Sequence, residues 1–399
     1  MRELLREREF VAYFLARQSS GLAYSIETVA IGWQVFGLRH RPFDLGLVGL
    51  LLFIPAVVLA VPAGIAADRI DRRVLCAICS VVEAACELSF IALVVSGSRT
   101  VGLYFGAVAL IGAAHAFGSP AQRVLLASIV RSQHFVRAQA IASTFMQLIA
   151  VAGPALGGAL VAVNVPSAFG AAALCYVVGA GAFAMLKSRG TELERAPEPR
   201  EAIAGIRYIA SHPVILGPIS LDLFAVLFGG ATALLPAYAT QILHVGAVGY
   251  GLLRSAPAVG AMLVAAWIVR HPLSRRTGAL LLGCVAGFGV ATIIFGVSRE
   301  LWLSLLMLAL AGGFDMVSVV IRSTLVQLRT PTVMRGRVTA IENVFIDASN
   351  ELGAFESGAA AALIGVVGSV VFGGAATLVV IAIWSALFPS LRRLDHITD

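Results

Sequence analysis

The chain has 399 residues, of which 59% are hydrophobic and 13% are charged, and its mean hydropathy is +0.91. Soluble domains carry about 25% charged residues, so this composition excludes a soluble globular protein and predicts many membrane-spanning helices. The net charge of +7 does not indicate nucleic-acid binding, because the arginines are scattered over short loops. Five cysteines lie in apolar segments, and no disulfide framework, metal site or cofactor is expected, the pair Cys76 and Cys79 included.

Apolar runs long enough to span a bilayer, about 20 residues each, occur twelve times. They cover residues 10–38, 44–66, 74–96, 101–126, 138–162, 165–186, 214–243, 249–269, 277–297, 301–326, 338–365 and 367–389. The connection 187–213 stands out because it is charged and contains three prolines. The sequence therefore predicts an all-α membrane protein with two six-helix halves, 1–186 and 214–399, joined by a cytoplasmic linker at 187–213.

The basic residues predict the orientation. If the N-terminus lies in the cytoplasm, 21 Lys and Arg residues fall on the cytoplasmic side, and only Arg39, Arg41, Arg99 and Arg299 fall outside. Cytoplasmic loops are enriched in Lys and Arg, so both termini are expected in the cytoplasm. Because 28 of the 29 basic residues are Arg, a bacterial source and the bacterial inner membrane are expected.

The two halves repeat each other. S-P-A-Q-R, ending at Arg123, is matched by S-V-V-I-R, ending at Arg322, and I-D-R-R at 70–73 is matched by L-S-R-R at 273–276. Repeats offset by half the chain indicate a duplicated six-helix unit, which is typical of transporters.

Residues 64–73, GIAADRIDRR, fit the pattern G-x-x-x-D-R-x-x-R-R. Here the sequence resembles the major facilitator superfamily, whose loop between helices 2 and 3 carries this pattern. The resemblance implies two pseudo-symmetric six-helix bundles and a cytoplasmic gate, with Glu342 nearby as a partner for Arg69 or Arg72. The alternative is that the arginines only fix the topology. The gate candidates are Gly64, Asp68, Arg69, Arg72, Arg73 and Glu342.

Two further strings point toward export. GPALGG at 153–158 resembles the antiporter signature of exporting branches, with Gly153, Pro154, Gly157 and Gly158 as its members, and ordinary helix packing is the alternative. RSTLVQLRTPTVMRGRVTA at 322–340 resembles the branch that includes the enterobactin and macrolide exporters.

Charges inside the expected spans are candidate proton or substrate residues, because a charge at the bilayer centre costs about 2.5–3.5 kcal/mol. The resemblance implies that helices 1, 4, 7 and 10 line a central cavity. Those helices carry Arg17, Glu27, His115, Arg123, Asp222, Asp315 and Arg322. We expect Glu27, Asp222 or Asp315 to couple protons to transport; fixed structural ion pairs are the alternative. Arg123 and Arg322 are also candidates for snorkelling toward the membrane surface.

Other charges fall on helices outside this set. Asp347 and Glu351 lie one turn apart and are expected to form a mid-membrane proton or substrate pair. Glu356 is expected nearer the outer side, with Arg254 as a possible partner. Glu83 and Glu87 lie on helix 3, which the resemblance makes peripheral, so a packing or ion-pair role is expected for them.

Together these features predict a monomeric secondary transporter that exports a small amphipathic molecule, of drug or siderophore type, in exchange for protons. Sodium is the alternative coupling ion. An importer or a lipid or lysolipid flippase of the same fold is the first alternative, and a non-transporting membrane sensor is the second. No nucleophile and base constellation suggests an enzyme.

Overall fold

The computed structural model describes residues 7–130, 132–186, 199–271, 276–392 and 395, and these residues are helical throughout, apart from short connections. The helices up to the expected linker are α1 (Arg8–Arg39), α2 (Pro42–Val58), α3 (Ala60–Arg69), α4 (Arg72–Val95), α5 (Val101–Ile129), α6 (Ser132–Val163) and α7 (Val165–Ala184). Beyond residue 198 follow α8 (Pro199–Ser211), α9 (Pro213–Phe228), η2 (Ala231–Leu234), α10 (Leu235–Ala237), η3 (Tyr238–Ile242), α11 (Gly246–Arg270), α12 (Thr277–Val297), α13 (Leu301–Arg329), α14 (Thr332–Leu387) and α15 (Pro389–Arg392).

These helices are consistent with the twelve expected spans. Within the described residues, nine helical stretches are long and apolar enough to cross a membrane, and the last of them, Met334–Leu387, is long enough for two crossings. That stretch breaks at Gly365, whose φ of 79° and ψ of 163° interrupt the helix; glycine adopts such angles without a steric penalty. The expected spans 338–365 and 367–389 meet at this residue.

Two expected spans are not continuous helices. The span 44–66 is divided at Leu59 into α2 and α3, and Pro62, which has no N–H, cannot bond to the carbonyl group of Val58. The span 214–243 ends its regular helix at Phe228 and continues through the 3₁₀ helix η2 and the π helix η3. Pro236 likewise cannot donate to the carbonyl group four residues before it.

The chain forms two compact units. The first contains Met1–His40, Leu50–Ala196 and Gly246–Ser255, and the second contains Arg41–Gly49, Pro197–Val245 and Ala256–Asp399. They differ from the expected halves because residues 41–49 belong with the second unit and 246–255 with the first. Of the expected linker, residues 187–198 lie outside the described residues, and part of the remainder forms α8. The division into halves at 186 and 214 stays a prediction.

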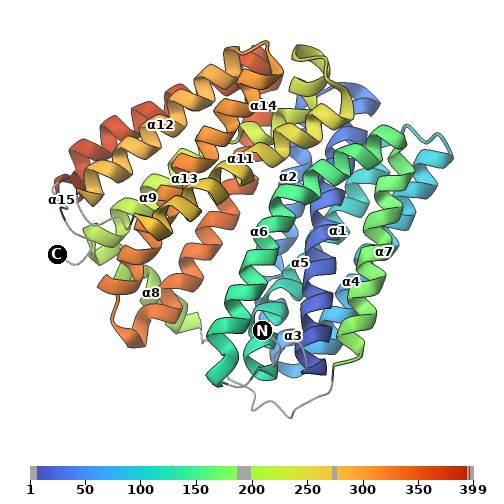
Figure 1. Ribbon diagram of the computed structural model, residues 1–399, viewed down its shortest axis with the longest axis horizontal. Helices are drawn as coiled ribbons and strands as arrows, with labels where there is room; N and C mark the ends of the chain where they lie inside the picture. The colour runs from blue at the N-terminus through green and yellow to red at the C-terminus, as the bar shows by residue number, and fades with distance from the viewer. Residues whose placement is uncertain (1–6, 131, 187–198, 272–275, 393–394, 396–399) are drawn as a thin grey trace. The chain divides into compact units, whose positions relative to one another are not determined.

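In the first unit α1 packs against α6 and α7, and α4 packs against α5 and α7 (Figure 1). Its core contains Phe10, Tyr13, Leu126 and Phe183. In the second unit α14 packs against α9 and α12, and α12 also packs against α13 (Figure 1). Large apolar side chains on the helix surfaces are exposed, such as Val269 at 82% and Leu363 at 86%, which suits contact with lipid.

Candidate functional site

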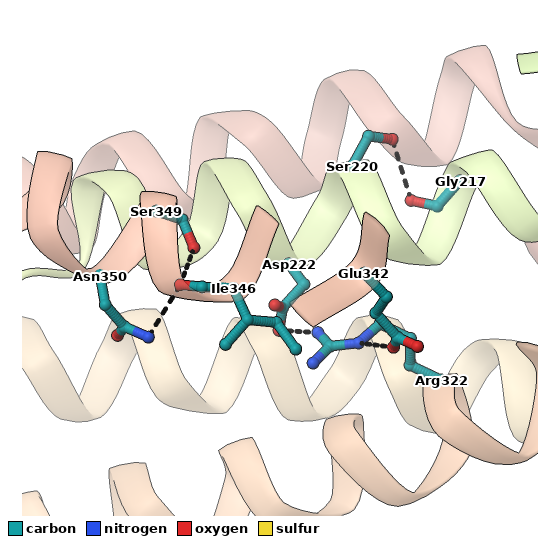
Figure 2. A network of polar contacts seen from close by, with 8 residues as sticks. All are labelled: Gly217, Ser220, Asp222, Arg322, Glu342, Ile346, Ser349 and Asn350. Carbon is teal, nitrogen blue, oxygen red and sulfur yellow. Dashed lines mark hydrogen bonds and ion pairs between the residues drawn. The ribbon is translucent and has the colours of Figure 1, made fainter. Parts of the chain in front are cut away.

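The clearest polar site in the second unit is centred on Arg322 of α13, which is 2% exposed. Its Nη1 forms an ion pair with Oδ1 of Asp222 on α9, and its Nε donates to Oε1 of Glu342 on α14 at 3.0 Å. Figure 2 shows the guanidinium group between the two carboxylates. Both acids are buried as well. Three helices are therefore joined through one cation, and we call Asp222, Arg322 and Glu342 the Arg322 network.

The Arg322 network corrects one sequence-based alternative. Snorkelling requires a side chain that reaches the polar surface, whereas Arg322 is buried and paired with two carboxylates. The side chain of Arg123 lies outside the described residues. Glu342 was expected to pair with Arg69 or Arg72; the structure gives it Arg322 as a partner, and a pairing across the two units stays a prediction.

Asp315 is joined to the Arg322 network by a small cavity. It lies seven residues before Arg322 on α13, two turns along the same helix face. A cavity of about 10 Å³ is bordered by Asp222, Asp315 and Ser318 and also lined by apolar side chains such as Phe288 and Phe314. That volume is close to the minimum for one water molecule.

The first unit holds a second set of buried polar groups. Glu27 of α1 is 1% exposed and accepts a hydrogen bond of 2.7 Å from the hydroxyl group of Tyr176 on α7. Nearby on α4, Glu83 lies 3.2 Å from Nε2 of His115 on α5, and Glu87 is fully buried. The ion-pair expectation for Glu83 fits this contact. The sequence indicated Glu27 and His115, but it gave no signal for Tyr176, one tyrosine on an apolar helix.

A cavity at the far end of α1 is large enough for part of a small molecule. It encloses about 350 Å³ and is lined by Trp33, Gln34, Gly37, Leu38 and Arg99, within the size range of ligand sites. The ring of Trp33 stacks on Tyr250 with centroids 6.0 Å apart. The lining offers an aromatic face, an amide and a cation, a combination suited to an amphipathic ligand. None of these lining residues was singled out from the sequence.

The gate motif lies at the junction of α3 and α4. Asp71 caps α4 by accepting from the Arg73 backbone N–H at 3.1 Å, and its other oxygen accepts from Arg73 Nε at 2.7 Å. Arg73 also donates to the carbonyl oxygen of Leu186, just beyond the end of α7. Gly64 and Arg69 lie on α3 and Arg72 opens α4, while the side chain of Asp68 lies outside the described residues. The gating role of the motif stays a prediction.

The GPALGG motif brings α6 close to two neighbours. A Cβ atom on Gly153 would lie 2.5 Å from Ser25 of α1, and one on Gly158 would lie 2.6 Å from the carbonyl oxygen of Ala247 on α11. With contacts this short, any side chain at either position would push the neighbouring helix away. Small residues of this kind allow helices to approach closely in membranes. Pro154 is buried, and Gly157 packs on Ile26 of α1. The packing alternative therefore has direct structural support, and a role in antiport stays a prediction.

The remaining candidates are spread over both units. On α14, Asp347 is exposed and Glu351 half-buried, and both take part in polar or electrostatic interactions. In the same turn, the carbonyl oxygen of Ile346 accepts from Ser349 and Asn350 (Figure 2). Two candidate arginines have tyrosine neighbours: Arg17 lies beside Tyr13, and Arg254 lies beside Tyr250. The candidate acid Glu356 is half-buried and accepts a hydrogen bond from Ser357. A pairing of Arg254 with Glu356 stays a prediction.

The chain is similar to known proteins over nearly its whole length. The family model described as transmembrane secretion effector matches residues 4–398. The chain belongs to this family of the major facilitator superfamily. It is 29% identical to the enterobactin exporter EntS of Citrobacter koseri, over 96% of this chain and 92% of that protein. The enterobactin exporter EntS of Escherichia coli O81 is 27% identical over the same shares.

Solved transporter structures share the fold. A bacterial homolog of the human lysosomal transporter Spinster, in an inward-facing unoccupied conformation, matches with a TM-score of 0.74 and 14% identity over 97% of both chains. The nucleoside transporter NupG matches with a TM-score of 0.76 and 11% identity, over 95% of this chain and 99% of that one. The protein is thus a multi-pass membrane transporter with the major facilitator fold. The alternative of a non-transporting membrane sensor is wrong, because the family consists of transporters.

Proposed function

We propose that the protein exports a small amphipathic molecule across the bacterial inner membrane in exchange for protons, by alternating access. Export is supported by relatives named as enterobactin exporters. The cavity lined by Trp33, Gln34 and Arg99 has room for part of a siderophore-like or drug-like molecule.

The observation that carries proton coupling is the charge balance around Arg322. Its guanidinium group faces Asp222 and Glu342, and Asp315 borders the same cavity as Asp222. One buried cation cannot neutralise three carboxylates. Each uncompensated buried charge costs several kcal/mol, and a bound proton removes that cost. The site therefore favours taking up protons whenever it is closed to water.

Proton exchange at this site would follow from changes in the partners of Arg322. When Arg322 faces both Asp222 and Glu342, the two ionised acids are stabilised by the cation. When the helices move and the cation leaves one of them, that acid gains a proton to avoid a bare buried charge. Because the three residues come from α9, α13 and α14, any sliding of these helices changes the pairing. Proton binding and helix movement are coupled in this way.

Import or lipid flipping by the same fold is the second candidate, and sodium is the alternative ion. No contact in the described residues favours either over proton-driven export. The described residues hold no group of three or more His, Cys, Asp or Glu side chains that could bind a metal ion.

The proposal is tested in inverted membrane vesicles with two probes, enterobactin and the fluorescent cation ethidium. Export corresponds to uptake into these vesicles, and an inside-acid pH gradient should drive uptake of one probe. Asp315→Asn should abolish the pH-driven component, whereas Glu300→Gln, at an exposed acid before α13, should leave it unchanged. Uptake that needs a sodium gradient, or that persists in Asp315→Asn, contradicts the proposal.

A further inference from the structure

The carboxyl groups of Glu27 and Glu87 form a buried pair in the first unit. Glu27 lies on α1 and Glu87 on α4, and they are 1% and 0% exposed. The two carboxyl groups lie close enough to interact electrostatically. Two ionised carboxylates at this separation, both removed from water, repel each other strongly, because the low dielectric of an apolar interior barely screens them.

Among the described residues, Glu27 receives a hydrogen bond and Glu87 does not. Glu27 accepts from the hydroxyl group of Tyr176 at 2.7 Å. Neither oxygen of Glu87 has a donor among the residues that the structure describes. An ionised carboxylate without donors is among the costliest groups to bury. A proton on Glu87 would remove its charge and give it an O–H group that donates to Glu27.

The described surroundings offer too little positive charge to replace this proton. The titratable groups around the pair come from three helices: Glu83 and Cys86 on α4, His115 on α5 and Tyr176 on α7. His115 is the one basic group among them, and its Nε2 lies 3.2 Å from Glu83. The imidazole, when protonated, acts on both Glu83 and Glu27, and one such cation cannot compensate three carboxylates.

We infer that Glu27 and Glu87 bind one exchangeable proton between them, as a second proton site of the transporter. The proton rests on Glu87, because the single O–H group of Tyr176 already points at Glu27 and supports its ionised form. When movement of α1 against α4 opens the pair to water, Glu87 gives its proton to a water molecule and becomes a carboxylate. On closure it takes a proton back. The role in transport rests on the proposed function, whereas the retained proton does not.

The proton is tested by infrared spectroscopy of the purified full chain, which resolves the C=O stretching band of protonated carboxyl groups. Glu87→Gln, which preserves shape and hydrogen bonding, should remove one component of this band. Glu27→Gln should shift the frequency of that component, because the Glu87 O–H loses its ionised acceptor. The component should also shift in heavy water, as an exchangeable proton requires. Glu300→Gln is the matched control and should leave the component in place.

Several outcomes would overturn the inference. One is a C=O stretching band that has the same components in Glu87→Gln, in Glu27→Gln and in the unmodified protein. Another is a carboxylate band that responds to added sodium chloride with no protonated component. The spectrum is recorded without transport, so the two proposals can be judged separately. If the protein shows the Glu87 component but does not couple protons to transport, the proposed function is wrong and the Glu27–Glu87 proton site stands. If transport is coupled to protons but the Glu87 component is missing, the proposed function stands and the Glu27–Glu87 proton site is wrong.

Discussion

The Nε atom of Arg322 donates to Oε1 of Glu342 at 3.0 Å, across the short connection between α13 and α14. The same guanidinium group is paired with Asp222 of α9. A single side chain thus joins three helices of the second unit at a buried point. Such a contact is expected to matter for both stability and movement.

Replacing Arg322 should destabilise the protein strongly. In Arg322→Met the carboxylates of Asp222 and Glu342 lose their cation, and removing one partner of a buried ion pair costs about 3–5 kcal/mol. Thermal unfolding in detergent should show the loss as a lower midpoint. The triple variant that adds Asp222→Asn and Glu342→Gln should recover most of it, because no buried charge is left unpaired. Equal midpoints for Arg322→Met and the unmodified protein would contradict the pairing.

The close contact of α6 with α11 gives a second prediction. Gly158→Ala places a methyl group where only 2.6 Å separates it from the carbonyl oxygen of Ala247, so the helices must move apart. We expect a lower unfolding temperature, because overpacking typically costs about 1–3 kcal/mol. Gly283→Ala is the matched control, since nothing lies within 4 Å of its Cβ position, and it should be neutral or stabilising. A Gly158→Ala protein as stable as Gly283→Ala would argue against the contact.

The cap of α4 predicts a difference between two substitutions at Asp71. Asp71→Ala removes the acceptor of the Arg73 backbone N–H and should cost about 0.5–2 kcal/mol. Asp71→Asn keeps a capping oxygen and should retain most of the stability. The ion pair with the Arg73 side chain is partly exposed and should add less than about 1 kcal/mol. If Ala and Asn variants unfold at the same temperature, the capping contact is not what stabilises this end.

Tyr176 should contribute more than an ordinary buried tyrosine. Its hydroxyl group donates to a carboxyl oxygen of Glu27 at 2.7 Å, and hydrogen bonds to charged groups contribute about 1.5–3 kcal/mol. Tyr176→Phe should therefore lower the thermal midpoint clearly. Tyr104→Phe, which removes a neutral hydrogen bond from Gln34 at 3.2 Å, should have a smaller effect. A larger loss in Tyr104→Phe would contradict an ionised Glu27.

Much of the fold could be predicted from the sequence, because a bilayer imposes a span length that shows directly in hydropathy. The twelve spans and the superfamily followed from that pattern and from GIAADRIDRR. The break at Leu59 was missed, since hydropathy is blind to one lost hydrogen bond near Pro62.

The partners within the site were harder to predict than its members. Arg322, Asp222 and Glu342 were each singled out, but they come from three helices. Which side chains meet depends on how each helix is rotated about its own axis, and hydropathy and motifs do not reveal that rotation. Glu87 was given a packing or ion-pair role because its helix was expected to be peripheral. Its spacing of four residues from Glu83 placed both on one face, which was the available signal. Burial and the missing donor became visible only in the structure.

The most direct test of proton-coupled export measures proton movement caused by the transported molecule. Purified protein in proteoliposomes, with a pH-sensitive dye inside and no initial pH gradient, is given an outward gradient of enterobactin or ethidium. Proton exchange predicts that the lumen becomes acidic as the probe leaves, and that Asp315→Asn abolishes this change while Glu300→Gln preserves it. Probe efflux with a constant luminal pH would contradict the account.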